Sequence, residues 1–204
     1  MRRIVLPGDM VAEDRVRMEN TYFRDGKTFA SVLGILDDER GSVISLEGAW
    51  KPKSGSEVVG IIRSVDRKTC SIELNHSAPG ILIPDRNSRY SPKVGDVVES
   101  IIARVERRNV PIMERARPVA EGARVIHVKP SKIPRILGKN NSMLRQIEEV
   151  TGARISVGVN GIIAISGDNT DDAIYAIRLI EENAHTSGLT DRVRDVLTER
   201  VSRH

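Results

Sequence analysis

The chain has 204 residues, which is enough for one to three small domains, since single domains usually run to about 50–250 residues. A formal net charge of +4 suits a polyanionic partner, while aromatic residues make up only 3% of the chain, so base stacking on aromatic side chains is poorly provided for. A single cysteine excludes an internal disulfide, and no apolar run approaches the roughly 20 residues that cross a bilayer, so we expect a soluble, cytoplasmic protein without membrane contact.

The first half of the chain reads as mainly β. In residues 1–54, Asp25-Gly26 precedes a β-type run at 28–33 and Gly41 precedes another at 42–46. Short runs at this spacing predict a small antiparallel sheet before a linker at residues 51–56. In residues 55–117 the β-type runs are longer, at 57–65, 70–74 and 97–105. Several strands with a glycine-led return at Gly95 are typical of a small OB-type barrel.

The period of the apolar residues changes from about residue 118, where the pattern becomes α+β. A strand at 124–128 and a short helix at 130–137 precede a second helix, two strands at 154–157 and 162–166, and a helix that starts near Thr170. This β-α-α-β-β-α order is that of a type I KH domain, predicted for residues 118–187. Residues 188–204 read as a helical tail, to which we assign no function.

Between the first two KH helices lies Gly138-Lys139-Asn140-Asn141, in the position of the G-x-x-G loop that clamps the backbone of single-stranded nucleic acid. Glycine lets a phosphate approach the main chain, and the N–H groups of the following helix, capped by Ser142, would face the anion. Asn141 replaces the second glycine, and asparagine tolerates left-handed dihedrals. The alternative is a plain turn between two helices. The candidate RNA-binding residues of this loop are Arg135, Gly138, Lys139, Asn140 and Asn141.

A second glycine cluster, Gly158-Val159-Asn160-Gly161, precedes a strand and not a helix, so no helix N-terminus points at it. Asn-Gly between two β-branched runs indicates a hairpin turn with positive φ at both residues. We therefore interpret Gly158, Asn160 and Gly161 as a structural turn.

Taken together, these motifs resemble the archaeal exosome RNA-binding cap subunit, a family built from an N-terminal domain, an S1-type barrel and a KH domain. The resemblance runs along the whole chain. It rests on Leu6 to Asp9, Gly60, Ile72 to Asn75, Ile133 to Arg135, Gly138 to Met143, and Gly158 to Gly161, the last being similar to a G-x-N-G signature at the junction of barrel and KH domain.

The resemblance implies a non-catalytic subunit without cofactors. Three copies, alone or mixed with a second cap protein, would sit on a hexameric ring of RNase PH-like subunits that degrades RNA from the 3′ end by phosphorolysis. The N-terminal domain would contact the ring, and the three barrels would surround the pore. Such caps are expected to raise the affinity for single-stranded RNA and to influence which tails, including poly(A), are degraded.

The barrel departs from typical S1-type domains, because its only aromatic candidate for the RNA face is Tyr90, and Cys70 stands where such caps often have tryptophan. We hypothesise that basic residues line a positive pore, the alternative being ordinary solvated charges. The candidates, with Tyr90, are Arg63, Arg67, Lys68, Arg86, Arg89, Lys93, Arg104, Arg107 and Arg108.

An enzymatic function finds no support in the sequence. The four histidines show no ligand spacing with Cys70 or with one another, so no metal site is predicted. Cys70 alternates with apolar positions of a strand, which predicts a packed residue and not a nucleophile. A free-standing RNA-binding regulator of translation, using the same two modules, is the alternative to the cap subunit.

Overall fold

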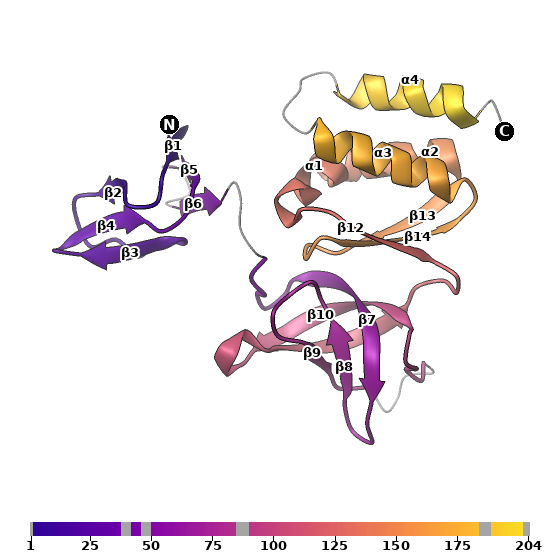
Figure 1. Ribbon diagram of the computed structural model, residues 1–204, viewed down its shortest axis with the longest axis horizontal. Coiled ribbons are helices and arrows are strands. Elements are labelled where there is room, and N and C mark those ends of the chain that lie inside the picture. The colour runs from indigo at the N-terminus through magenta and orange to yellow at the C-terminus, as the bar shows by residue number, and fades with distance from the viewer. Residues whose placement is uncertain (1, 38–41, 46–49, 85–89, 184–188, 202–204) are drawn as a thin grey trace. The chain divides into compact units, whose positions relative to one another are not determined.

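The computed structural model describes residues 2–37, 42–45, 50–84, 90–183 and 189–201 (Figure 1). The chain divides into two compact units, Met1–Ala49 and Trp50–His204. The division falls a few residues before the boundary expected at residue 54, so the segment that reads as a linker lies in the second unit.

The first unit holds two three-stranded antiparallel sheets, where the sequence predicted one. The first sheet has the order β1 (Arg2–Val5), β5 (Gly34–Asp37), β6 (Ser42–Ser45), and the second has the order β2 (Met10–Ala12), β4 (Lys27–Ala30), β3 (Thr21–Arg24). Small apolar side chains form the core between them: Val5, Ala30, Leu36 and Val43 are buried. A run that reads as one strand at 28–33 is broken, because β4 ends at Ala30 and the chain crosses to the other sheet.

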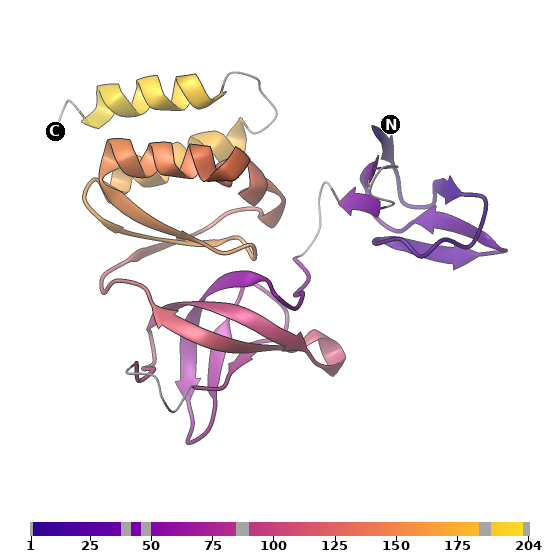
Figure 2. The ribbon, with the colours of Figure 1, turned by 180° about the vertical axis from the view of Figure 1, so that it is seen from behind.

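Five strands of the second unit close into a barrel, which confirms the predicted OB-type fold (Figure 2). The strands are β7 (Glu57–Val65), β8 (Cys70–Glu73), β9 (Gly80–Leu82), β10 (Val97–Val105) and β11 (Pro111–Pro118). Around the barrel they follow the order β7-β8-β9-β11-β10, with β9 and β11 parallel. Alternating apolar residues, such as Cys70 and Ile72 of β8, fill the interior and are at most 1% exposed.

The KH domain has the predicted β-α-α-β-β-α order. It comprises β12 (Arg124–His127), α1 (Ile133–Leu137), α2 (Ser142–Thr151), β13 (Ala153–Val157), β14 (Ile162–Gly167) and α3 (Thr170–Glu182). The antiparallel sheet has the order β12-β14-β13. The helix expected from residue 130 begins with a short 3-10 turn, Pro130–Lys132, before α1. The helices pack on one face of the sheet (Figure 1).

The other face of the KH sheet packs against the barrel. Ile162 and Ala164 of β14 and Val59 of β7 are each at most 1% exposed and form a small apolar cluster of their own. Barrel and KH domain therefore share buried surface, which makes the KH sheet a layer between the barrel and the helices.

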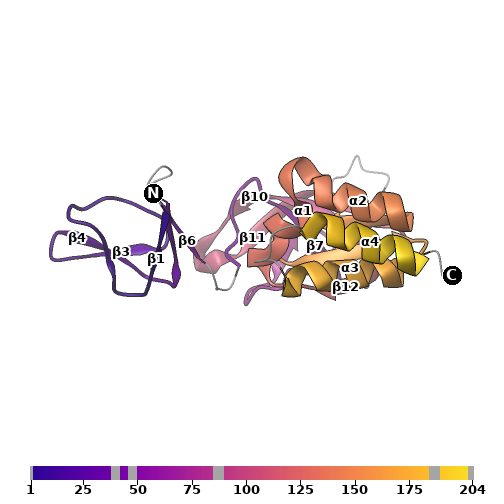
Figure 3. The same cartoon turned by 90° about the horizontal axis from the view of Figure 1, so that it is seen from above.

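The helical tail is an ordered part of the KH domain. Helix α4 (Leu189–Val201) lies over α2 and α3 (Figure 3) and buries Leu189, Val193 and Leu197, a stripe with a spacing of four residues. None of the helices in the described part of the chain is both long and apolar enough to span a bilayer.

Candidate nucleic-acid interface

The KH loop has the backbone that a phosphate-binding turn needs. Gly138 lies at φ 72°, and a Cβ placed on it would lie 2.8 Å from the backbone nitrogen of Met143. Both the left-handed conformation and this close approach therefore require glycine. Asn140 and Asn141 follow with φ of 53° and 61°, so asparagine does adopt the left-handed turn predicted for it.

The predicted cap by Ser142 is wrong. Ser142 is the first residue of α2, and the residue before it, Asn141, occupies the cap position without a side-chain hydrogen bond to the helix. Because Asn141 is left-handed, its side chain does not reach the first amides in the usual capping geometry. The N–H groups at the start of α2 are thus left without a side-chain acceptor, which is the arrangement in which a helix terminus attracts an anion.

Lys139 and Arg135 flank this turn, and both side chains are exposed. Lys139 belongs to the turn itself, whereas Arg135 lies one helical turn earlier, on α1. The structure therefore gathers the five predicted loop residues around the start of α2, and their contact with RNA remains a prediction.

The predicted basic residues of the barrel fall into two groups. Glu57 pairs with Ile101 and Ile61 pairs with Val97, so β7 and β10 run in opposite directions. The β7–β8 turn and the β10–β11 turn consequently extend from opposite ends of β7. Arg67 and Lys68 belong to the first turn, with Arg63 and Lys93 near it, and Arg104, Arg107 and Arg108 belong to the other end.

The positive charges of two arginines in these groups are partly neutralised by neighbouring carboxylates. Arg63 donates to Glu73 of the neighbouring strand, and Arg104 lies 3.1 Å from the Glu106 carboxylate. Both pairs are exposed and add little to stability, at most about 1 kcal/mol each. Arg67, Lys68, Arg107 and Arg108 are exposed and have no ion pair within the described part of the chain. Arg86 and Arg89 lie outside the described residues.

Tyr90 is held by the barrel. Its hydroxyl donates a 2.6 Å hydrogen bond to Asp96, and its ring packs in part against the barrel core. Burial, followed by this hydrogen bond to a carboxylate, raises the pKa of Tyr90. A fixed ring of this kind offers little freedom to stack on a base.

A second aromatic group, which the sequence reading did not assign, lies at the β10–β11 end. The rings of Trp50 and His76 meet edge to face with centroids 5.8 Å apart, and the His76 Nε2 lies 3.3 Å from the Asn109 carbonyl oxygen. These residues come from three separate loops, so no local pattern could indicate their contact. Trp50 packs partly against the barrel core.

The Gly158–Gly161 hairpin is confirmed, but the predicted turn type is wrong. The Gly158 N–H donates to the Ile162 carbonyl, and only Gly161, at φ 85°, is left-handed. The loop therefore has three residues, with Asn160 outside the left-handed region. The reason is that the Asn160 side chain enters the junction with the barrel and is fully buried there.

Among the described residues, no group of three or more histidine, cysteine, aspartate or glutamate side chains is arranged so that it could hold a metal ion. Cys70 is 1% exposed, and burial raises the pKa of its thiol, so it is a packed residue, as its alternation with apolar positions predicted.

Comparison with known proteins supports the assignment of the KH domain and relates the chain to exosome proteins. Residues 123–182 match the KH domain family. The chain is 32% identical to the exosome complex component Rrp4 of Thermofilum pendens, covering 98% of this chain and 94% of that protein. It is also 32% identical to Rrp4 of Thermococcus kodakarensis, with 98% and 86% covered. A solved structure described as an exosome complex RNA-binding protein superposes with a TM-score of 0.65 at 26% identity, covering 76% of this chain and 98% of that one.

Proposed function

Because this chain belongs to the Rrp4 family of exosome complex components, we propose that it is a non-catalytic RNA-binding cap subunit of an archaeal exosome. It captures the 3′ ends of single-stranded RNA and guides them through a pore lined by S1-type barrels into a phosphorolytic ring of RNase PH-like subunits. In doing so it raises the affinity for RNA and influences the preference for tails such as poly(A).

One observation carries the RNA-binding part of this proposal. OB-type barrels bind oligonucleotides on the face of their second and third strands and through the loops after the first and fourth strands. Here those strands are β8 and β9, and the two loops carry the exposed pairs Arg67 with Lys68, and Arg107 with Arg108. The two pairs thus flank the face that an OB-type barrel uses.

The mechanism that these residues support is electrostatic. Exposed arginine and lysine without carboxylate partners neutralise RNA phosphates and release the cations condensed on the RNA, and stacking on aromatic rings is a secondary contribution. For a single strand, the slope of log K against log salt changes by about −0.7 for each phosphate contact. A slope near zero would contradict this mechanism.

Binding of a labelled single-stranded RNA, measured by fluorescence anisotropy at several salt concentrations, tests the proposal. We expect affinity to fall steeply with salt, and we expect Arg107→Glu with Arg108→Glu to weaken binding and flatten the slope. Arg17→Glu with Arg24→Glu, at two exposed arginines of the first unit, is the matched control for added negative charge.

Co-elution with RNase PH-like ring subunits in size-exclusion chromatography tests the assembly. RNA binding without co-elution would favour the alternative, a free-standing regulator of translation. Incubation of the chain alone with RNA, phosphate and Mg²⁺ tests the non-catalytic role, and processive shortening of the RNA would contradict it.

The KH loop is tested separately. Arg135→Glu together with Lys139→Glu should weaken RNA capture, because both side chains flank the open start of α2. Unchanged affinity in a folded double variant would confine binding to the barrel.

A further inference from the structure

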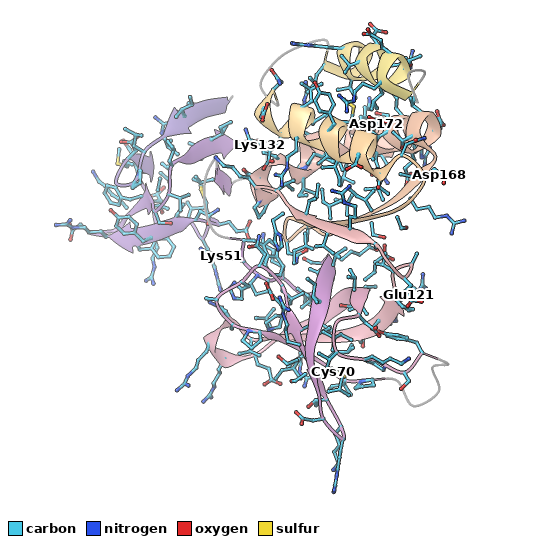
Figure 4. The ribbon with its side chains drawn as sticks, turned by 45° about the vertical axis from the view of Figure 1, so that its right-hand side comes forward. Lys51, Cys70, Glu121, Lys132, Asp168 and Asp172 are labelled. Atoms are coloured by element: carbon cyan, nitrogen blue, oxygen red, sulfur yellow. The ribbon has the colours of Figure 1, made fainter. Side chains whose placement is uncertain are left out.

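Helix α4 is fixed beside the KH loop by three kinds of contact. Its apolar stripe, Leu189, Val193 and Leu197, is at most 1% exposed. Near its end the Arg200 Nε donates a 2.8 Å hydrogen bond to Asp172 of α3, which is only 2% exposed (labelled in Figure 4). The Arg200 guanidinium also lies 4.2 Å from the ring centroid of Tyr175, also on α3. These contacts hold α4 at a defined position over α2 and α3.

This position of α4 creates a hollow on the KH domain. Its wall is made by the KH loop, by the outer face of α2 and by α4. The lining residues are Lys139, Asn140, Ser142, Arg145, Gln146, Glu149, Val150, Arg194 and Thr198. Three different elements therefore contribute to one concave surface, which includes the start of α2.

The charge of the hollow is positive. Lys139 of the loop, Arg145 of α2 and Arg194 of α4 are exposed, and none of these three side chains has an ion pair or hydrogen bond to another described residue. The single carboxylate of the lining is Glu149. The Ser142 N–H donates to the Lys139 carbonyl, but no side chain caps the start of α2, and the positive end of this helix at the same hollow favours an anion further.

We propose that α4 completes a phosphate-binding hollow on the KH domain, in which Lys139, Arg145 and Arg194 hold the backbone of single-stranded RNA. This inference rests on the proposed function, because it needs a chain that binds RNA. It adds a contribution that the KH loop lacks: α4 brings Arg194, so the helical tail binds ligand in addition to covering the apolar face of the KH domain.

Two pairs of variants in the full chain test the inference by RNA anisotropy titration over a range of salt concentrations. Arg194→Gln should lower the affinity about two- to fivefold, as for loss of an exposed ion pair, and should reduce the salt slope by about 0.7. Arg192→Gln is the matched control, because Arg192 is an exposed arginine of the same helix that does not line the hollow. It should leave both quantities unchanged.

For Glu149→Gln we expect the opposite effect on the affinity for RNA. Removal of the only carboxylate in the hollow should raise the affinity for RNA, a gain that a purely structural role of α4 does not produce. Glu182→Gln, at an exposed carboxylate of α3 outside the hollow, should have no effect. Unfolding midpoints of all four variants establish that each is folded.

The outcomes separate this inference from the function on which it rests. Equal loss in Arg194→Gln and Arg192→Gln would overturn it, because binding would then follow net charge alone. Binding by the wild-type chain with no effect of Arg194→Gln or Glu149→Gln would overturn it and leave the proposed function intact. Absence of RNA binding by the wild-type chain would overturn both.

Discussion

The side-chain amide of Asn160 bonds to both backbone groups of Val59, as a neighbouring strand would. Its Oδ1 accepts from the Val59 N–H at 3.3 Å, and its Nδ2 donates to the Val59 carbonyl at 2.8 Å and to the Leu74 carbonyl at 2.9 Å. Asn160 belongs to the KH hairpin, while Val59 and Leu74 belong to the barrel. One buried asparagine thus fixes the KH sheet on the barrel.

Asn160→Ala should destabilise the second unit strongly. The change leaves the N–H and carbonyl of Val59 and the carbonyl of Leu74 buried without their partner, and each unsatisfied group costs about 1–3 kcal/mol. We expect a loss of roughly 3 kcal/mol or more in the free energy of unfolding, measured with urea. Asn183→Ala is the control, because Asn183 directly follows α3 and its amide donates to the Leu179 carbonyl one turn earlier. A similar loss in both variants would argue against the special role of Asn160.

Some of this architecture could be predicted from the sequence, and the reasons differ by element. Apolar residues recur with a period of two in the barrel strands and of 3.6 in α3, because one face of each element packs against the core. This local pattern is sufficient to predict these elements. For Asn160 the sequence predicts the correct hairpin but a positive φ, which the structure does not have. Its conformation depends on the barrel, whose Val59 is about a hundred positions away in the chain.

In the candidate site, too, local sequence determines some features and tertiary packing determines others. The left-handed Asn141 was predicted, because residue type alone limits φ. The hollow beside α4 was not, because Lys139, Arg145 and Arg194 come from three elements that only tertiary packing brings together. For that reason the sequence alone predicts no function for the helical tail.

Gly138→Ala should distort the KH loop and destabilise the protein. A Cβ at this position would need to lie 2.8 Å from the Met143 nitrogen, in addition to the cost of a left-handed alanine. Gly122→Ala separates the two effects, since Gly122 has φ 77° and open space around its Cβ position. We expect a cost of about 1 kcal/mol for the control and roughly 2 kcal/mol more for Gly138→Ala in thermal unfolding. Equal costs would mean that the loop tolerates the side chain.

Stability should fall with rising pH in the alkaline range. Burial, with a smaller effect of the Asp66 carboxylate, raises the pKa of Cys70 above its ordinary value of 9.0, and burial raises the pKa of Tyr90. A raised pKa means that the folded state keeps a proton that the unfolded state has lost, so the stabilisation is complete below the unfolded pKa and disappears as pH rises through the folded one. Urea unfolding between pH 8 and 10 should show this slope, and Cys70→Ala should reduce it. A slope unchanged by Cys70→Ala would exclude this thiol as its source.

Fluorescence of Trp50 should report RNA at the β10–β11 turn. Trp50 is the only tryptophan of the chain, and its ring contacts His76, which in turn lies 3.3 Å from the Asn109 carbonyl. RNA held by Arg107 and Arg108 should therefore change the emission of Trp50 on titration. Arg107→Gln with Arg108→Gln should remove this change. Arg67→Gln with Lys68→Gln, at the opposite end of β7, should weaken binding but keep the change, and loss of the signal in both double variants would contradict the assignment.

Arg200→Ala should loosen α4 without unfolding the KH sheet. The change leaves Asp172, whose side chain is 4% exposed, without the guanidinium that pairs with it, and also removes the contact with the Tyr175 ring. Because Arg200 itself is 41% exposed, water offsets part of the loss, and we expect about 2 kcal/mol, less than for a fully buried pair. Hydrogen exchange should become faster in α4 while β14 stays protected. Arg200→Ala with Asp172→Asn should recover part of the protection, because the second change removes the buried charge. Uniform exchange across α4 and β14 would instead show that the helix and the sheet unfold as one unit.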